Sequence, residues 1–163
     1  MSNNKYNVLF LCTGNSARSI MAEALLSRWG REHFNAFSAG SNPKGRVHPL
    51  TLKTLEKSNF NTEGYRSKSW EEFTCDDAPD IDFIITVCSN AAKETCPVIP
   101  GEPVSAHWDV EDPAADYETE EEQKHAFYRA FLELDERIQL FTCLPMEKID
   151  KMALHEHLKK ISN

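Results

Sequence analysis

Residues 8–19 read Val-Leu-Phe-Leu-Cys-Thr-Gly-Asn-Ser-Ala-Arg-Ser, and this stretch decides the fold. Its first four residues form a continuous apolar run, which is typical of a strand covered on both faces of a parallel sheet. Small and polar residues follow, including Gly14, where we expect the backbone to turn tightly. From Ser19 to Glu32 apolar residues return at helical spacing. The stretch therefore predicts a strand, a tight loop and a helix in direct succession.

The same alternation continues along the chain. Strands are predicted at 37–39, 83–87 and 104–108, and helices at 48–57, from Ser69, at 120–140 and at 150–161. Strands that alternate with helices predict an α/β fold with a mostly parallel sheet. The length of 163 residues fits one domain, so we expect residues 1–163 to form a single domain that ends in a C-terminal helical extension, at about 146–163.

The composition excludes several classes of partner. The formal net charge of -8 argues against a nucleic acid or an anionic membrane surface, because both require a basic face. No apolar stretch approaches the roughly 18 to 20 residues of a membrane span, and the first residues lack the apolar core of a secretory signal. We therefore expect a cytoplasmic protein, and a monomer. Its five cysteines are an odd number, which fits catalytic or buried thiols better than a framework of disulfides.

The loop after the first strand carries the chemistry that the sequence indicates. In open α/β sheets the ligand site lies beyond the carboxyl ends of the strands, which is where Cys12 falls. The spacing C-x5-R from Cys12 to Arg18 brings a thiol and a guanidinium around one short loop, whose backbone N–H groups can converge on an anion. The positive end of the following helix favours a thiolate. The residues predicted to bind the oxyanion are Thr13, Gly14, Asn15, Ser16, Ala17 and Ser19.

Other interpretations of these residues were weighed. The loop lacks the Walker A sequence and the dinucleotide-binding fingerprint. The bare C-x5-R pattern is weak, and a buried cysteine beside a surface arginine would produce it without any function. A zinc site is a third possibility, but its candidate ligands lack the usual spacing of structural zinc sites. Those candidate ligands are Cys75, Cys88, Cys96, His107 and His125.

Residues 8–19, followed by Met21-Ala22-Glu23, resemble the active-site loop of low-molecular-weight protein tyrosine phosphatases, and especially of the arsenate reductases built on that fold. Three more stretches extend the resemblance: Phe37 to Gly40, Thr86 to Cys88 with Cys96-Pro97, and His107-Trp108 with Asp112-Pro113-Ala114. The resemblance implies a three-layer sandwich in which helices flank a central, mostly parallel four-stranded sheet.

Roles for single residues follow from the resemblance. It implies that Cys12 is the nucleophile, that Arg18 grips the oxyanion, and that Asp112 is the general acid. Asn15 would hold the loop and Ser19 would hydrogen-bond the thiolate. In relatives, the positions of Asn15, Glu23 and Ser38 can also hold a potassium ion. A proton donor opposite the nucleophile makes chemical sense, because a hydroxide or alkoxide must leave a tetrahedral anion. Without the resemblance, an ordinary Asp-Pro turn is an alternative interpretation of Asp112.

A reductase and a phosphatase differ after the first step, and the cysteines favour the reductase. The resemblance implies a disulfide relay from Cys12 to Cys88 and then to Cys96, with arsenate as substrate and phosphate or sulfate as its analogue. No tightly bound cofactor is expected, only an external thiol reductant, which is thioredoxin or glutaredoxin with glutathione. Two departures stand out. The segment from Cys88 to Cys96 is one residue longer than in the thioredoxin-linked members, and Ala17 replaces a second loop cysteine. Glutathione could therefore act in place of Cys96, and hydrolysis of phosphomonoesters remains the alternative function.

Overall fold

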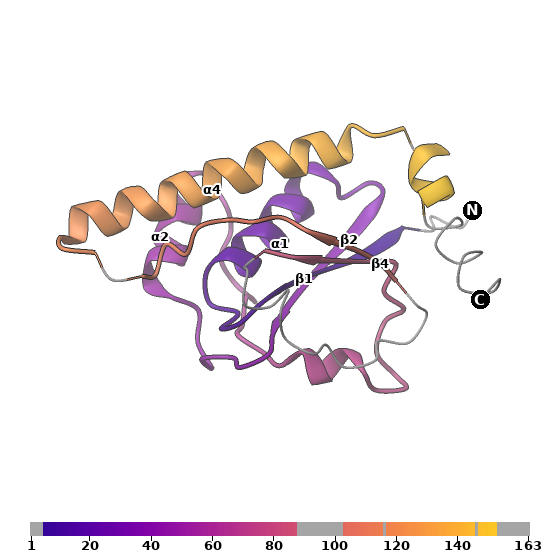
Figure 1. Cartoon of the computed structure of the whole chain (residues 1–163), viewed down its shortest axis with the longest axis horizontal. Helices are drawn as coiled ribbons and strands as arrows, with labels where there is room; N and C mark the ends of the chain where they lie inside the picture. Colours follow the sequence, from indigo (N-terminus) through magenta and orange to yellow (C-terminus); the bar gives the residue numbers. More distant parts are fainter. Residues whose placement is uncertain (1–4, 88–102, 116, 146, 153–163) are drawn as a thin grey trace.

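The computed structural model describes residues 5–87, 103–115, 117–145 and 147–152. Four strands form one sheet, namely β1 (Tyr6–Cys12), β2 (Phe34–Gly40), β3 (Phe83–Thr86) and β4 (Val104–His107). Their order is β2-β1-β3-β4, and every pairing is parallel (Figure 1). This confirms the predicted parallel sheet, with β1 between β2 and β3.

Helices cover the sheet. The elements are α1 (Arg18–Trp29), α2 (Pro49–Lys57), α4 (Glu120–Thr142) and the 3-10 helix η1 (Trp70–Phe73). The first three pack together over one face of the sheet, and η1 lies at the other face beside β2 (Figure 1). The predicted last helix starts earlier than expected, because residues 147–152 are already helical. Its predicted remainder lies outside the described residues.

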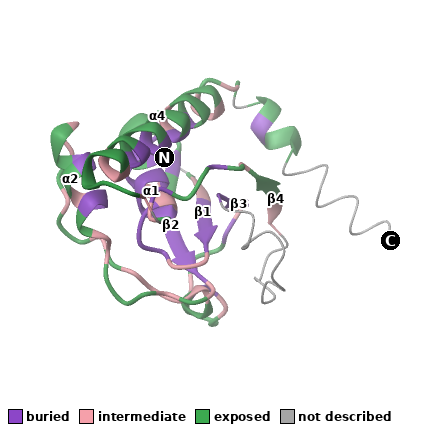
Figure 2. Ribbon diagram, turned by 60° about the vertical axis from the view of Figure 1, so that its left-hand side comes forward, coloured by how far each residue is buried: buried purple, intermediate pink, exposed green. Residues whose placement is uncertain are grey.

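Strand β1 is buried on both sides, as its apolar run predicts (Figure 2). Val8 and Phe10 belong to the larger core under α1 and α4, whereas Leu9 and Leu11 belong to a smaller core on the opposite face. In the larger core, residues from α1 and α4 join them, including Leu25, Phe127 and Leu134. Because alternate β1 residues serve the two cores, the strand is held in a fixed register, and its last residue has a defined position.

Helix starts follow the sequence only in part. Thr119 Oγ1 accepts a hydrogen bond from the Glu122 amide at 3.1 Å and so caps α4, whose start at Glu120 agrees with the helix predicted at 120–140. Ser69 Oγ accepts from the Glu71 amide at 3.2 Å, but Glu72 pairs with Arg66 rather than closing a capping box. Among the described residues, no helix is both long and apolar enough to cross a membrane.

Candidate active site

Cys12 is the last residue of β1, and its thiol is enclosed by the loop that follows. The residue is only 3% exposed. Its Sγ lies 2.9 Å from Ser19 Oγ and accepts a hydrogen bond from the Asn15 amide at 3.3 Å. Ser19 lies in the first turn of α1, so the loop and the helix start surround the sulfur together. Both contacts favour a thiolate, because each can place a hydrogen at the sulfur.

The side chain of Asn15 sets the direction of the hydrogen bonds at this sulfur. Its Oδ1 accepts from the Lys68 amide at 2.8 Å, so its Nδ2 donates to Ser19 Oγ, also at 2.8 Å. Since the Ser19 oxygen accepts from Asn15, its own proton is available to Cys12 Sγ. Asn15 and Ser19 are completely buried, so water does not compete for these groups.

The loop backbone bends from residue 13 to residue 17, and this bend includes Gly14 as predicted, but the residue with a left-handed conformation is Asn15. Asn15 has a φ of 45°, whereas Gly14 is not among the residues with positive φ. Asparagine tolerates this left-handed conformation better than most residues. A Cβ at Gly14 would meet only the flexible Lys44 side chain, 3.3 Å away. The small size of Gly14 therefore leaves room for Lys44 rather than permitting a special backbone angle.

Carbonyl oxygens of the loop point away from its centre. Those of Thr13, Gly14 and Ser16 accept hydrogen bonds of 2.7 to 3.0 Å from surrounding segments. The Thr13 carbonyl accepts from the Asn42 amide. The Gly14 carbonyl accepts from the Lys44 amide and the Ser67 hydroxyl. The Ser16 carbonyl accepts from the His48 amide and the Thr51 hydroxyl. In a trans peptide the N–H points opposite to the preceding C=O, so the next amides face the opposite side. The Asn15 amide, which reaches Cys12 Sγ, follows this rule. The loop is thus built to present N–H groups to an anion.

Gly40 lets β2 end close against this loop. A Cβ at this position would lie 2.4 Å from the Thr13 carbonyl oxygen and 3.0 Å from the Asn15 nitrogen. Both are backbone atoms and cannot move aside cheaply. The absence of a side chain at Gly40 therefore fixes how closely the second strand supports the cradle.

Arg18 connects the loop to the segment that carries Asp112. Its Nη1 donates to the Val110 carbonyl at 2.9 Å, and its Nη2 lies 3.7 Å from Asp112 Oδ1. The Arg18 side chain is 14% exposed and that of Asp112 is 49% exposed. The Asp112 carboxylate also accepts from the Ala114 amide at 2.9 Å. The structure thus places the Arg18 guanidinium, at the end of the loop that begins at Cys12, next to the Asp112 carboxyl.

His48 lies beside the loop, near the positive charges of Lys44 and Arg46. Burial is the main cause that lowers the pKa of His48, and the positive charges of Lys44 and Arg46 lower it further. The nearby Asp112 carboxylate has the opposite, smaller effect. Neutral His48 is also required by its role at α2, because its Nδ1 accepts from the Leu50 amide at 3.0 Å.

Glu23, Ser38 and Asn15, the positions that hold potassium in relatives, surround a lysine in this chain. Ser38 hydrogen-bonds Glu23, and the Lys68 ammonium lies 3.5 Å from Ser38 Oγ. Burial raises the pKa of Glu23, while its bond to Ser38 and the charge of Lys68 act against that rise. Burial lowers the pKa of Lys68, because it disfavours the charged form of a lysine as it does that of a carboxyl.

The structure does not place every predicted residue. Cys88 and Cys96 lie outside the described residues, and the roles given to them stay predictions. Val87, which precedes Cys88, is buried, and its amide donates to the Leu11 carbonyl at 2.9 Å. The described ranges contain no group of three or more His, Cys, Asp or Glu side chains that could hold a metal ion. Cys75 and Cys143 are exposed.

Sequence reasoning missed several residues of the site, namely Lys44, His48, Lys68 and the Val110 carbonyl. Lys44 and His48 follow Gly40, at the carboxyl end of the strand beside β1, and that position was an available signal. The Lys68 amide and the Val110 carbonyl come from distant segments, and no sequence pattern marks such backbone contacts.

Comparisons with known proteins agree with this geometry. A family model described as low molecular weight phosphotyrosine protein phosphatase matches residues 7–154. An arsenate reductase of Bacillus licheniformis is 35% identical over 141 residues, which cover 84% of this chain and 95% of the relative.

Solved structures extend the likeness to the fold. The arsenate reductase from Archaeoglobus fulgidus gives a TM-score of 0.65 at 30% identity, and the match covers 83% of this chain and 98% of that one. A thioredoxin-dependent arsenate reductase from Corynebacterium glutamicum gives a TM-score of 0.57 at 28% identity, and the match covers 86% of this chain and 65% of that one. These matches confirm the resemblance stated for the active-site loop and the predicted fold. The chain belongs to the low molecular weight phosphotyrosine protein phosphatase family.

Proposed function

We propose that this protein is an arsenate reductase that uses Cys12 as its nucleophile. The observation that carries the proposal is the enclosed Cys12 sulfur, which lies 2.9 Å from Ser19 Oγ and 3.3 Å from the Asn15 nitrogen in an amide-lined loop closed by Arg18. Arsenate is a tetrahedral oxyanion that such a loop can bind. The arsenate reductases from Bacillus licheniformis and Archaeoglobus fulgidus, which resemble this chain over most of its length, support the same activity.

In the first step, the Cys12 thiolate attacks arsenic and forms a sulfur–arsenic bond. One arsenate hydroxyl leaves as water, and Asp112 supplies the proton for it. Arg18 stabilises the oxyanion, because its guanidinium has five N–H donors in a planar fork and the contacts to Val110 and Asp112 do not use all of them. The side chain of Asp112 is 49% exposed, so water can return a proton to it after each turnover.

In the second step, the thiolate of Cys88 attacks Cys12 Sγ. A disulfide forms between the two cysteines, the sulfur–arsenic bond breaks, and its electron pair reduces arsenic from the +5 to the +3 state, so that arsenite leaves. The position of Val87 supports this step, because its hydrogen bond to Leu11 holds the residue before Cys88 next to the strand that ends at Cys12. Cys96 then attacks Cys88, which frees Cys12 and moves the disulfide along the chain.

An external dithiol completes the cycle by reducing the last disulfide. The thioredoxin dependence of the Corynebacterium glutamicum structural relative supports thioredoxin as this reductant. Glutathione with glutaredoxin would serve if Cys96 takes no part. Either reductant requires a compartment that keeps thiols reduced, which agrees with the cysteine usage of the chain.

The test is arsenite formation from arsenate by the purified protein, with thioredoxin, thioredoxin reductase and NADPH, or with glutaredoxin and glutathione. We expect turnover in one of the two systems, loss of turnover in Cys12→Ser and Cys88→Ser, and nearly parental turnover in Cys75→Ser, an exposed matched control. If neither system yields arsenite, the proposal is wrong. If Cys96→Ser also loses the turnover that thioredoxin supports, the relay reaches Cys96.

Phosphomonoester hydrolysis is the second candidate, because the family model that matches residues 7–154 is that of a phosphatase. Water would then attack a cysteinyl phosphate on Cys12, and no second thiol would be needed. An aryl phosphate substrate separates the two functions. A phosphatase keeps its activity in Cys88→Ser, whereas arsenate reduction is lost in that variant.

A further inference from the structure

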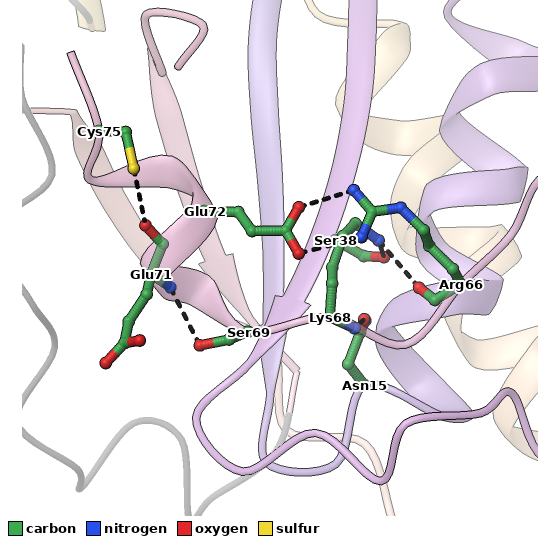
Figure 3. A network of polar contacts seen from close by, with 8 residues as sticks. All are labelled: Asn15, Ser38, Arg66, Lys68, Ser69, Glu71, Glu72 and Cys75. Atoms are coloured by element: carbon green, nitrogen blue, oxygen red, sulfur yellow. Dashed lines mark hydrogen bonds and ion pairs between the residues drawn. The ribbon is translucent and has the colours of Figure 1, made fainter. Parts of the chain in front are cut away.

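Lys68 reaches the active-site loop from a separate segment of the chain (Figure 3). Its backbone amide donates to Asn15 Oδ1 at 2.8 Å. Its ammonium donates to the Arg66 carbonyl at 3.0 Å and lies 3.5 Å from Ser38 Oγ. One residue therefore contacts, through its two ends, both the asparagine that orients the loop and the serine that binds Glu23.

The three groups that would hold a potassium ion are already engaged. The Asn15 oxygen accepts from the Lys68 amide, the Ser38 hydroxyl donates to Glu23, and the same hydroxyl faces the Lys68 ammonium. Potassium would need oxygen ligands around an open space, but here a side-chain ammonium lies 3.5 Å from the Ser38 oxygen. These residues therefore do not fit a potassium ion.

A positive charge near Glu23 would stabilise its ionised form, which burial disfavours. Glu23 is a carboxyl enclosed next to Ser38, whose side chain is completely buried, and an unpaired charge there would be costly. Lys68 is attracted to Glu23 through space and is itself partly buried. Arg66, the other nearby cation, forms its closest contacts with Glu72, at 2.6 and 3.0 Å. Of these two basic side chains, Lys68 is therefore the one that contacts the hydrogen-bonded pair of Ser38 and Glu23.

We propose that the ammonium of Lys68 is a built-in cation that replaces the potassium ion of relatives and makes this protein independent of potassium. Its covalent attachment has a mechanical consequence. The residue that neutralises Glu23 also fixes the amide of Asn15, and Asn15 in turn directs the Ser19 hydroxyl toward the Cys12 sulfur. Lys68 is therefore a positioning residue that links the charge of Glu23 to the shape of the oxyanion cradle.

A double-mutant cycle on thermal stability tests the pairing of the two charges and needs no assumption about the substrate. Lys68→Met keeps the backbone contact to Asn15 but removes the ammonium. We expect it to lower the melting temperature by at least about 3 °C, and we expect Lys68→Met combined with Glu23→Gln to recover at least half of that loss. The control Lys53→Met, which removes an exposed lysine of α2, should change the melting temperature by less than about 1 °C. If the effects of the two single variants simply add, the proposal is overturned.

Potassium itself provides the second readout. Melting temperatures are compared in potassium chloride and in choline chloride at equal ionic strength. The parent protein should melt at the same temperature in both salts. In Lys68→Ser, which opens space next to Ser38 and Glu23, potassium should raise the melting temperature relative to choline. A potassium-specific rise in the parent protein would contradict the proposal, and so would a Lys68→Ser variant as insensitive to potassium as Lys53→Met.

Discussion

The guanidinium of Arg18 lies 3.7 Å from the carboxylate of Asp112, which ties the start of α1 to the segment after β4. The same guanidinium donates to the Val110 carbonyl at 2.9 Å. An acid that protonates a leaving hydroxyl has to lie next to the oxyanion site. The contact with Arg18 holds Asp112 next to the end of the active-site loop. In the proposed function, Arg18 binds the anion and Asp112 supplies the proton.

Replacing Asp112 with Asn tests this division of roles. The variant keeps the shape of the side chain and an oxygen that can accept from the Ala114 amide, but it cannot donate the proton. We expect turnover of arsenate to fall by roughly 10²- to 10⁴-fold, the usual contribution of a general acid. The free energy of unfolding should fall by less than about 1 kcal/mol, because the ion pair is half exposed. Alkylation of Cys12 by iodoacetamide at the parental rate would show that the thiol is intact, and a parental turnover would rule out the acid role.

Replacing Asn15 with Asp tests the hydrogen-bond direction at the sulfur. A carboxylate at this position accepts from Ser19 and does not donate, so the Ser19 proton turns away from Cys12. It also adds a negative charge near the thiolate. We expect alkylation of Cys12 at neutral pH to slow by about tenfold or more, since a hydrogen bond to a charged group contributes about 1.5–3 kcal/mol.

Asn15→Gly is the matched control for the backbone of the same position. Glycine accepts the φ of 45° that Asn15 adopts, so this variant removes the amide contacts without straining the loop. We expect an intermediate alkylation rate, between those of the parent and of Asn15→Asp. Equal rates in all three proteins would mean that Asn15 does not direct the Ser19 proton.

The sequence predicted the elements of the fold and the chemical groups of the site, but not the contacts that orient them. The apolar run before Cys12 and the helical spacing after Ser19 are local signals, and the strand, loop and helix appear where these signals place them. The sequence predicts a tight turn at Gly14, and the structure bends there, but no local signal marks Asn15 as the residue with the left-handed angle. Asn15 can adopt that angle because Lys68 and Ser19 bind its side chain, and no local pattern reveals bonds across 53 residues.

The strand boundaries illustrate the same limit. The second strand was predicted at 37–39 but extends over Phe34–Gly40. Residues 35–37 are not buried, so the apolar signal is weak there, and pairing with β1 decides the strand instead. The backbone of a neighbouring strand is information that a single segment of sequence does not carry.

Replacing Gly40 with Ala tests the close approach of β2 to the cradle. The added Cβ would lie 2.4 Å from the Thr13 carbonyl oxygen, so the loop or the strand end must shift. We expect a loss of about 2–4 kcal/mol in the free energy of unfolding, which is the range of severe single substitutions. Gly14→Ala is the control, because its Cβ meets only the flexible Lys44 side chain. Urea unfolding measures both, and equal stability of the two variants would contradict the assigned role of Gly40.

The pH dependence of stability tests the neutral state of His48. Burial and the positive charges of Lys44 and Arg46 lower its pKa in the folded protein, whereas the unfolded chain has the ordinary value of about 6.5. Between the lowered pKa and about pH 6.5, the unfolded state therefore binds a proton that the folded state does not. Stability from His48 is complete above about pH 6.5 and is lost as the pH falls toward the lowered value. Protonation would also remove the Nδ1 acceptor that caps α2.

The variant His48→Asn separates this titration from the cap itself. Its side-chain oxygen can accept from the Leu50 amide as Nδ1 does, since Asn is a favourable N-cap residue, but it does not titrate. Free energies of unfolding are measured for both proteins by urea denaturation at about pH 7.5 and about pH 5.5. All other titrating groups are common to the two proteins, so the parent should lose more stability than His48→Asn over this interval. A parent that loses the same amount as the variant, or less, would show that His48 is protonated in the folded protein as easily as in the unfolded chain.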